Sequence, residues 1–194
     1  MTVPDTTDSL RGTLVDAAAD LSACVAAVDP ARLDALADAV HGARAVFVCG
    51  AGRSLLVLRC LAMRLMHLGY TAHVVGDVTC PAFGPGDLLL CASGSGETEG
   101  TVRRAVRARA LGGTVAALTI EEGSALGRAA DVVVPIPGFT DKRPLAGREG
   151  RPTLPGGSLF EEAVLLVGDS LVVPLAERQG VPVDRAFSRH ANLE

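Results

Sequence analysis

From residue 45 to residue 135 the chain alternates short apolar runs with stretches that have the apolar spacing of amphipathic helices. Such alternation is typical of βαβ units, in which a crossover helix follows each parallel strand. The apolar runs predict strands at residues 45–49, 71–75, 87–92, 114–119 and 131–135. Helices are expected between them at about 53–68, 97–111 and 123–129, and a loop or single turn at 75–87. The chain is therefore expected to fold around a parallel sheet.

The composition fits this prediction. Hydrophobic residues make up 48% of the sequence, yet there are only five Phe, one Tyr and no Trp, so the core must be aliphatic. Aliphatic parallel strands covered by Ala-rich helices suit such a core. A length of 194 residues fits one α/β domain with a well-buried interior. We expect a single domain over 1–194, with helices at 1–43, the sheet core at 44–136, a loop at 137–157 and a C-terminal helix and tail at 158–194.

Before the first strand the sequence has helical spacing over about residues 5–43, interrupted by Asp29 and Pro30. Proline disfavours the helical conformation in the residue before it, so the break divides the segment into two helices. We expect a helical hairpin or kinked pair whose role is packing or oligomerisation.

After the last strand, residues 139–157 have little pattern and several prolines, which indicates a long loop. Ser158 is then expected to start a long helix that runs to about Gln179 and ends at Gly180. Ser158 and Glu161 have the spacing of a capping box. Glu161 therefore has either a purely structural role at the helix start or a role in chemistry.

The charge balance excludes some classes of function. There are 18 basic and 22 acidic side chains, a formal net charge of −4, which argues against a general nucleic-acid-binding surface.

The first residues do not resemble a signal peptide, and no apolar run reaches the roughly 18 residues that a membrane span needs. Five cysteines without a C-x-x-C pair are typical of reduced thiols. We expect a cytoplasmic protein.

Residues 50–54 read Gly-Ala-Gly-Arg-Ser, where the first strand should end and a helix begin. Such a turn aims backbone N–H groups and the positive end of a helix at a ligand, and an anion suits it. The segment is not a dinucleotide fingerprint, because Leu55 occupies the position of the third small residue. From this loop alone, phosphate binding and a simple tight turn both remain open.

Residues 93–98 read Ser-Gly-Ser-Gly-Glu-Thr and follow another expected strand. Three hydroxyls and several flexible amides at a helix start are suited to a phosphomonoester. An N-cap serine would explain only one of these hydroxyls. In a doubly wound sheet both loops open at the carboxyl edge of the strands, so they are expected to face one crevice.

Several segments together resemble a known family. They are residues 50–54, 62–70, 74–76, 93–98, 157–161 and 189–194, the last reading Arg-His-Ala-Asn-Leu-Glu. In these segments the chain is similar to the sugar isomerase (SIS) domain family and, within it, to the 6-phospho-3-hexuloisomerases. The resemblance covers nearly the whole chain and is weakest before residue 40.

The resemblance implies a fold and an activity. The fold is a three-layer α/β/α, doubly wound, flavodoxin-like arrangement with a five-stranded parallel sheet. The activity is the interconversion of D-arabino-3-hexulose 6-phosphate and fructose 6-phosphate through an enediol, as in the ribulose monophosphate pathway. A homotetramer or dimer is implied, with a sugar-phosphate substrate, no cofactor and no metal.

The resemblance also implies which residues hold the phosphate. The hydroxyl groups are those of Ser54, Ser93, Ser95 and Thr98, with backbone help from Gly52 and Gly94.

Glu161 and His67 become the catalytic candidates by the same resemblance. A carboxylate shielded from water is a suitable base for the proton on carbon, which favours Glu161 for that step. His67 would move protons on the substrate oxygens, within its own subunit or a neighbouring one. Arg53 could neutralise the enediolate or the phosphate, or instead pair with an acidic neighbour. His190 could contact the sugar, or belong to a tail that holds a subunit interface.

Two features leave the substrate open. Leu55 stands where a smaller residue is expected in the hexuloisomerases, and residues 154–157 also depart from their pattern. An isomerase of another sugar phosphate, such as arabinose 5-phosphate, or a noncatalytic sugar-phosphate sensor therefore remain alternatives.

A basic run on the helix after the second loop is expected to be solvated or to pair between subunits. It consists of Arg103, Arg104, Arg107 and Arg109.

Overall fold

The computed structural model describes residues 6–141, 152–182 and 189–193, and contains one five-stranded sheet whose strands are all parallel. The strands are β1 (Val46–Cys49), β2 (Ala72–Val74), β3 (Leu88–Ala92), β4 (Thr114–Thr119) and β5 (Val132–Pro135). Their order is β2-β1-β3-β4-β5, which is the flavodoxin-like order. The predicted sheet is confirmed, and each strand lies within the run that predicted it.

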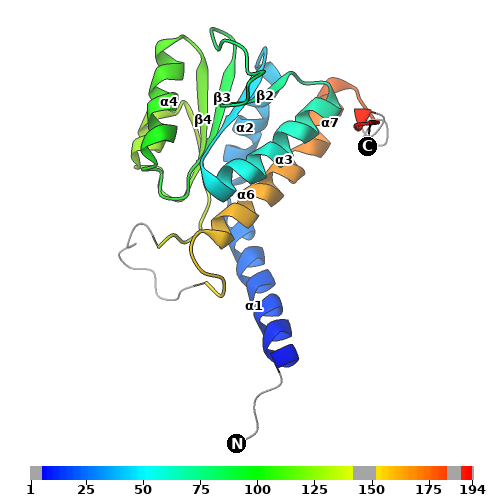
Figure 1. Cartoon of the computed structure of the whole chain (residues 1–194), viewed down its shortest axis with the longest axis vertical. Helices are drawn as coiled ribbons and strands as arrows, with labels where there is room; N and C mark the ends of the chain where they lie inside the picture. The colour runs from blue at the N-terminus through cyan, green and yellow to red at the C-terminus, as the bar shows by residue number, and fades with distance from the viewer. Residues whose placement is uncertain (1–5, 142–151, 183–188, 194) are drawn as a thin grey trace, which may run out of the picture.

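Helices cover both faces of this sheet, so the expected three layers are confirmed (Figure 1). One face packs against α2 (Pro30–Gly42), α3 (Gly52–Leu68), α6 (Ser158–Ser170) and α7 (Val172–Gln179). The other face packs against α4 (Glu99–Ala110) and α5 (Ala125–Ala129). Alternate residues of each strand point to opposite faces. Val46 and Val48 therefore join the first core, and Phe47 and Cys49 join the second.

The helical N-terminus is also confirmed. Helix α1 (Thr6–Ala26) packs along α6 and then extends beyond the rest of the molecule (Figure 1). Asp29 is the N-cap of α2, where its carboxylate accepts from the N–H of Ala31 at 2.9 Å. Leu10 and Leu14 on α1 are more than two-thirds exposed, so this helix presents apolar side chains to solvent.

The C-terminal helix differs from its prediction in two ways. It consists of two helices, α6 and α7, because Pro174 has no N–H to donate to the carbonyl of Ser170. Ser158 is also not the N-cap of α6: Gly157 holds that position, and no side chain caps the helix. The predicted capping box is therefore wrong. Gly180 ends α7 in the left-handed conformation, as predicted.

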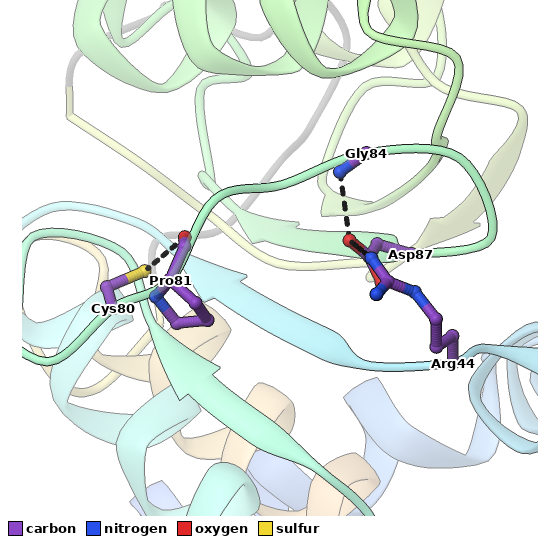
Figure 2. A network of polar contacts seen from close by, with 5 residues as sticks. All are labelled: Arg44, Cys80, Pro81, Gly84 and Asp87. Atoms are coloured by element: carbon purple, nitrogen blue, oxygen red, sulfur yellow. Dashed lines mark hydrogen bonds and ion pairs between the residues drawn. The ribbon is translucent and has the colours of Figure 1, made fainter.

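The crossover from β2 to β3 contains no helix, since residues 75–87 form turns and irregular chain. The carboxylate of Asp87 anchors the end of this segment (Figure 2). Its Oδ2 accepts from the N–H of Gly84 at 2.9 Å and from the guanidinium of Arg44 at 2.7 Å. This segment takes the place of a covering helix on the face occupied by α4 and α5.

None of the described helices combines the length and apolar composition that crossing a bilayer requires.

Candidate active site

The two predicted loops begin side by side at the carboxyl edge of the sheet. Strands β1 and β3 are neighbours, and Cys49, the last residue of β1, lies opposite Cys91, one residue before the end of β3. From β1 the chain continues through α3 to β2, and from β3 it continues through α4 to β4, in the opposite direction. Such a reversal of strand order opens a crevice beyond the strand ends, where doubly wound proteins bind ligands. The predicted common crevice is therefore present.

The first loop brings the backbone of α3 close to the end of β3. A Cβ added to Gly50 would lie 3.1 Å from the nitrogen of Leu55 and 3.2 Å from the carbonyl oxygen of Ala92. Gly52 has a φ of +55°, which favours glycine. Ala51 is the N-cap of α3 and provides no side-chain cap. The first N–H groups of α3 are thus left for another acceptor.

The second loop is held in a tight turn by its own hydroxyls and amides. The hydroxyls of Ser93 and Thr98 lie 3.0 Å apart, and the N–H of Glu97 donates to Ser95 Oγ at 3.3 Å. The Glu97 carboxylate reaches α5, where it accepts from the N–H of Ala125 at 3.0 Å. Glu97 therefore fixes the loop, and the hydroxyls face the crevice.

Three helices begin at this crevice. Thr98 is the N-cap of α4 and, like Ala51 at α3 and Gly157 at α6, makes no side-chain capping bond. Helix N-termini carry a partial positive charge and unsatisfied N–H groups. Their convergence makes the crevice suited to a doubly charged anion such as a phosphomonoester.

The crevice encloses a cavity of about 270 Å³. Eight of the ten residues singled out from the sequence line it: Gly52, Arg53, Ser54, Ser93, Gly94, Ser95, Thr98 and Glu161. Ser54, Ser93 and Ser95 are buried, and Arg53 is exposed at the rim. The cavity therefore has hydroxyl and amide donors at its base and a charged pair at its side.

That charged pair is formed by Arg53 and Glu161. The Nε of Arg53 donates to Oε2 of Glu161, and the Glu161 side chain is 14% exposed while that of Arg53 is 60% exposed. Arg53 was expected either to neutralise the enediolate or the phosphate, or to pair with an acidic neighbour. The structure contains the ion pair, and the pair lies in the cavity wall. An arginine that holds a carboxylate in place beside a bound sugar can also respond to negative charge that develops on that sugar.

His67 and His190 lie elsewhere. The two rings are stacked with centroids 4.2 Å apart at the C-terminal end of α3. Helix α3 has 17 residues and is about 25 Å long, and the cavity is at its other end. Within one chain, neither histidine reaches a sugar phosphate held in the cavity. Their predicted roles remain predictions, and within the chain the structure does not bring them to the other eight residues.

The surroundings of His67 favour its neutral form. Burial lowers the pKa of the His67 ring, and the charges of His190 and Arg64 lower it further. Its Nδ1 is buried and has no hydrogen-bond partner among the described residues. Arg189 lies over Gly69 at the helix end, where an added Cβ would come within 2.3 Å of Nη1. The segment 189–193 therefore covers the end of α3.

Cys49 and Cys91, which sit at the ends of β1 and β3, form a buried pair behind the loops. A hydrogen bond with Cys49, together with burial, raises the pKa of the Cys91 thiol well above its usual value. The same hydrogen bond lowers the pKa of Cys49, and the charge of Arg104 acts in the same direction. All five cysteines are free thiols.

Five lining residues were not singled out from the sequence, and the two with the largest side chains are Thr140 and Phe160. Thr140 is 7% exposed and lines the cavity, although it lies in the stretch that gave no pattern. Phe160 forms part of the wall against Gly94, where an added Cβ would lie 3.3 Å from Cδ1. The only signal for Thr140 was its position in a long loop after the last strand. Leu55, which stands where a smaller residue is expected in the hexuloisomerases, is not among the described residues that line the cavity.

Within residues 6–141, 152–182 and 189–193, no group of three or more His, Cys, Asp or Glu side chains is placed to hold a metal ion.

Comparisons with known proteins agree with this geometry. A family model described as the SIS domain matches residues 40–142. A protein of Bacillus subtilis named 3-hexulose-6-phosphate isomerase is 41% identical over 161 residues, which cover 83% of this chain and 86% of that protein. A protein of the same name from Mycobacterium gastri is 45% identical over 171 residues, covering 87% of this chain and 83% of the relative.

A solved structure gives the same comparison in three dimensions. It is a hypothetical protein of Methanococcus jannaschii, with a TM-score of 0.72 and 33% identity over 84% of this chain and 86% of that chain. Its crystal structure is described as inferring a molecular function of 3-hexulose-6-phosphate isomerase.

Proposed function

Because this chain belongs to the SIS domain family, we propose that it interconverts D-arabino-3-hexulose 6-phosphate and fructose 6-phosphate in the cavity between α3, α4 and α6. One observation carries the proposal. Three helix N-termini without side-chain caps meet at buried hydroxyls, with one carboxylate in the same wall. These features support a phosphate and a proton acceptor within one small cavity.

The base of the cavity would bind the 6-phosphate. Its oxygens would accept from the N–H groups that begin α3 and from the hydroxyls of Ser54, Ser93, Ser95 and Thr98. Gly52 and Gly94 let the phosphate approach the backbone, since neither has a Cβ. Such anchoring leaves the carbon end of the sugar to point toward the side wall.

The reaction needs one base and no change of oxidation state overall. The base removes the proton from C2 of the 3-hexulose, and the electron pair forms the C2–C3 double bond of an enediolate as charge moves to the C3 oxygen. The proton on the C2 oxygen is then transferred to the C3 oxygen. Reprotonation at C3 gives the C2 ketone of fructose 6-phosphate.

Glu161 is the proposed base. Its side chain is mostly shielded, lies in the wall of the cavity and is oriented by Arg53. General bases of this kind contribute about 10² to 10⁴ in rate. The guanidinium of Arg53, held beside it, would stabilise the charge of the enediolate.

His67 and His190 enter this proposal only through a neighbouring copy. Both lie about one helix length from the cavity of their own chain, so they would serve a second subunit whose cavity opens at this end of α3. The proposed assembly is accordingly a homotetramer or dimer. The exposed apolar side chains Leu10 and Leu14 on α1 offer a surface for it.

We also propose that the protein is cytoplasmic and acts in the ribulose monophosphate pathway. Five free thiols suit a reducing compartment.

The decisive experiment follows solvent deuterium into the sugar. The protein is incubated in D₂O with fructose 6-phosphate, arabinose 5-phosphate and other ketose and aldose phosphates, and exchange is followed by NMR. The proposal expects deuterium at C3 of fructose 6-phosphate and formation of the 3-hexulose. Exchange into arabinose 5-phosphate alone would indicate a different isomerase. Tight binding without exchange into any sugar would indicate a sensor.

A further inference from the structure

A second cavity lies on the face of the sheet that α4 and α5 cover. It has a volume of about 290 Å³ and occupies the region where the β2–β3 crossover has no helix. Its floor is apolar and its rim is basic. The floor includes Phe83, Leu89 and Leu111, and the rim is formed by Arg103, Arg104 and Arg107.

The aromatic wall of this cavity is held in place from several sides. The ring of Phe83 meets the ring of Phe47 edge to face, with centroids 5.1 Å apart. It also lies against Gly113, where an added Cβ would come within 2.3 Å of the ring. The next residue, Gly84, is tied to the buried carboxylate of Asp87 (Figure 2). The wall is therefore a fixed part of the fold.

Two of the three arginines of the rim have no carboxylate partner among the described residues. Among the described residues, Arg104 and Arg107 form no ion pair, although Arg104 lies beside the Cys49 thiol. Arg103 forms an ion pair with Glu99 at 3.5 Å, in which both side chains are well exposed. Arg109 on the same helix differs, since it pairs with Asp131 at 3.2 Å and does not line the cavity. In a chain with a net charge of −4, three arginines beside an apolar hollow form a local site of the opposite sign.

We propose that this second cavity binds a small amphipathic anion, in which a flat apolar ring carries a phosphate or carboxylate. The ring would lie on the apolar floor beside Phe83. The anionic group would be held by the planar guanidinium groups of the rim, which match phosphate and carboxylate oxygens in pairs. The volume is at the lower end for ligand pockets, so the ligand is about the size of a mononucleotide.

The same chemistry separates this ligand from the substrate of the other cavity. A sugar phosphate would leave its hydroxyl groups unpaired against Phe83, Leu89 and Leu111, which costs binding free energy. In the active-site cavity, hydroxyls and amides surround the phosphate instead. The two cavities should therefore select different anions.

Calorimetry with the full chain tests the proposal, using 1-naphthyl phosphate and adenosine 5′-monophosphate as probes. Saturating fructose 6-phosphate is present so that the active-site cavity is occupied. At least one probe is expected to bind under these conditions. The double substitution Arg104→Ala and Arg107→Ala should weaken binding at least tenfold. Arg109→Ala, on the same helix, and Ser54→Ala, in the other cavity, should leave it unchanged.

Three outcomes would overturn the proposal. The first is that neither probe binds, and the second is that binding survives the double substitution. The third is that fructose 6-phosphate displaces the probe and Ser54→Ala abolishes its binding, which would place the anion in the active-site cavity. In a further alternative, a second copy of the chain covers these arginines. Light scattering tests it, because the double variant would then change its oligomeric state. Turnover of fructose 6-phosphate is measured separately, so failure here leaves the proposed isomerase activity standing.

Discussion

Arg53 and Glu161 are 108 residues apart in the chain and form an ion pair in the wall of one cavity. Arg53 lies in the first turn of α3, and Glu161 lies in the first turn of α6. The carboxylate is largely shielded while the guanidinium is largely exposed. The pair thus orients a carboxylate toward the cavity from a helix whose own N-terminus lacks a side-chain cap.

Replacing Glu161 by Gln should abolish most turnover and preserve binding. Glutamine keeps the shape of the side chain and cannot accept the proton from C2. We expect kcat to fall by about 10² to 10⁴, and the Kd for fructose 6-phosphate to change little, as measured by coupled kinetics and calorimetry. Glu162→Gln, one position along and outside the cavity lining, is the matched control. Full activity in Glu161→Gln would remove this residue as the base.

Replacing Ser54 by Ala should weaken phosphate binding. Its hydroxyl lines the cavity and is buried in the first turn of α3. A hydrogen bond to a charged group is worth about 1.5–3 kcal/mol, so KM should rise about tenfold or more. Inhibition by inorganic phosphate should weaken in parallel. Ser170→Ala, whose hydroxyl donates to the carbonyl of Val167 at 2.8 Å, should alter neither value. An unchanged KM for Ser54→Ala would exclude its hydroxyl as a phosphate ligand.

Asp87→Asn should destabilise the fold. The Asp87 side chain is fully buried and accepts from Gly84 and Arg44, so a neutral amide weakens both contacts. We expect a loss of about 1–3 kcal/mol in the free energy of unfolding, measured by urea denaturation. Asp77→Asn breaks an ion pair with Arg59 in which both partners are well exposed, and should cost no more than about 1 kcal/mol. Equal effects of the two substitutions would contradict the anchoring role of Asp87.

Stability should fall in mild acid because of His67. Its folded pKa lies below 6.5, so between pH 6.5 and that lower value the unfolded chain binds a proton that the folded chain does not. The free energy of unfolding therefore rises with pH across this window and levels off above it. His67→Gln should flatten that slope, measured by denaturation from pH 5 to 7.5. His190→Ala should flatten it in part, because it removes one cause of the lowered pKa. A slope that is the same in His67→Gln and the unsubstituted chain would refute the assignment.

The sheet could be predicted from the sequence because each strand is a short, fully apolar run between turn residues. All four residues of β1 and all five of β3 are buried, which leaves no polar position to obscure the pattern. The break between α6 and α7 was missed although Pro174 marks it, since the apolar spacing continues across the proline. The single-domain assignment over 1–194 stays a prediction.

The meeting of the two loops at one cavity could be predicted because both are compact and lie next to strand ends. The partner of Arg53 could not, since the pairing with Glu161 depends on how α6 docks against α3. Local spacing favoured a capping box for Glu161, and tertiary contact decided otherwise. The separation of His67 from the cavity follows from the length of α3, which the sequence also contained. Glu194, the last residue of the 189–194 motif, lies outside the described residues.

The three helices that begin at the cavity without side-chain caps have a consequence for how the site can evolve. Their N–H groups belong to the main chain, and apart from substitution by proline a mutation leaves them in place. Side chains such as Thr140 and Phe160, which shape the rest of the cavity, can change independently. Under the proposed function, single substitutions could accommodate a new sugar while the main-chain N–H groups that would bind its phosphate stay unchanged.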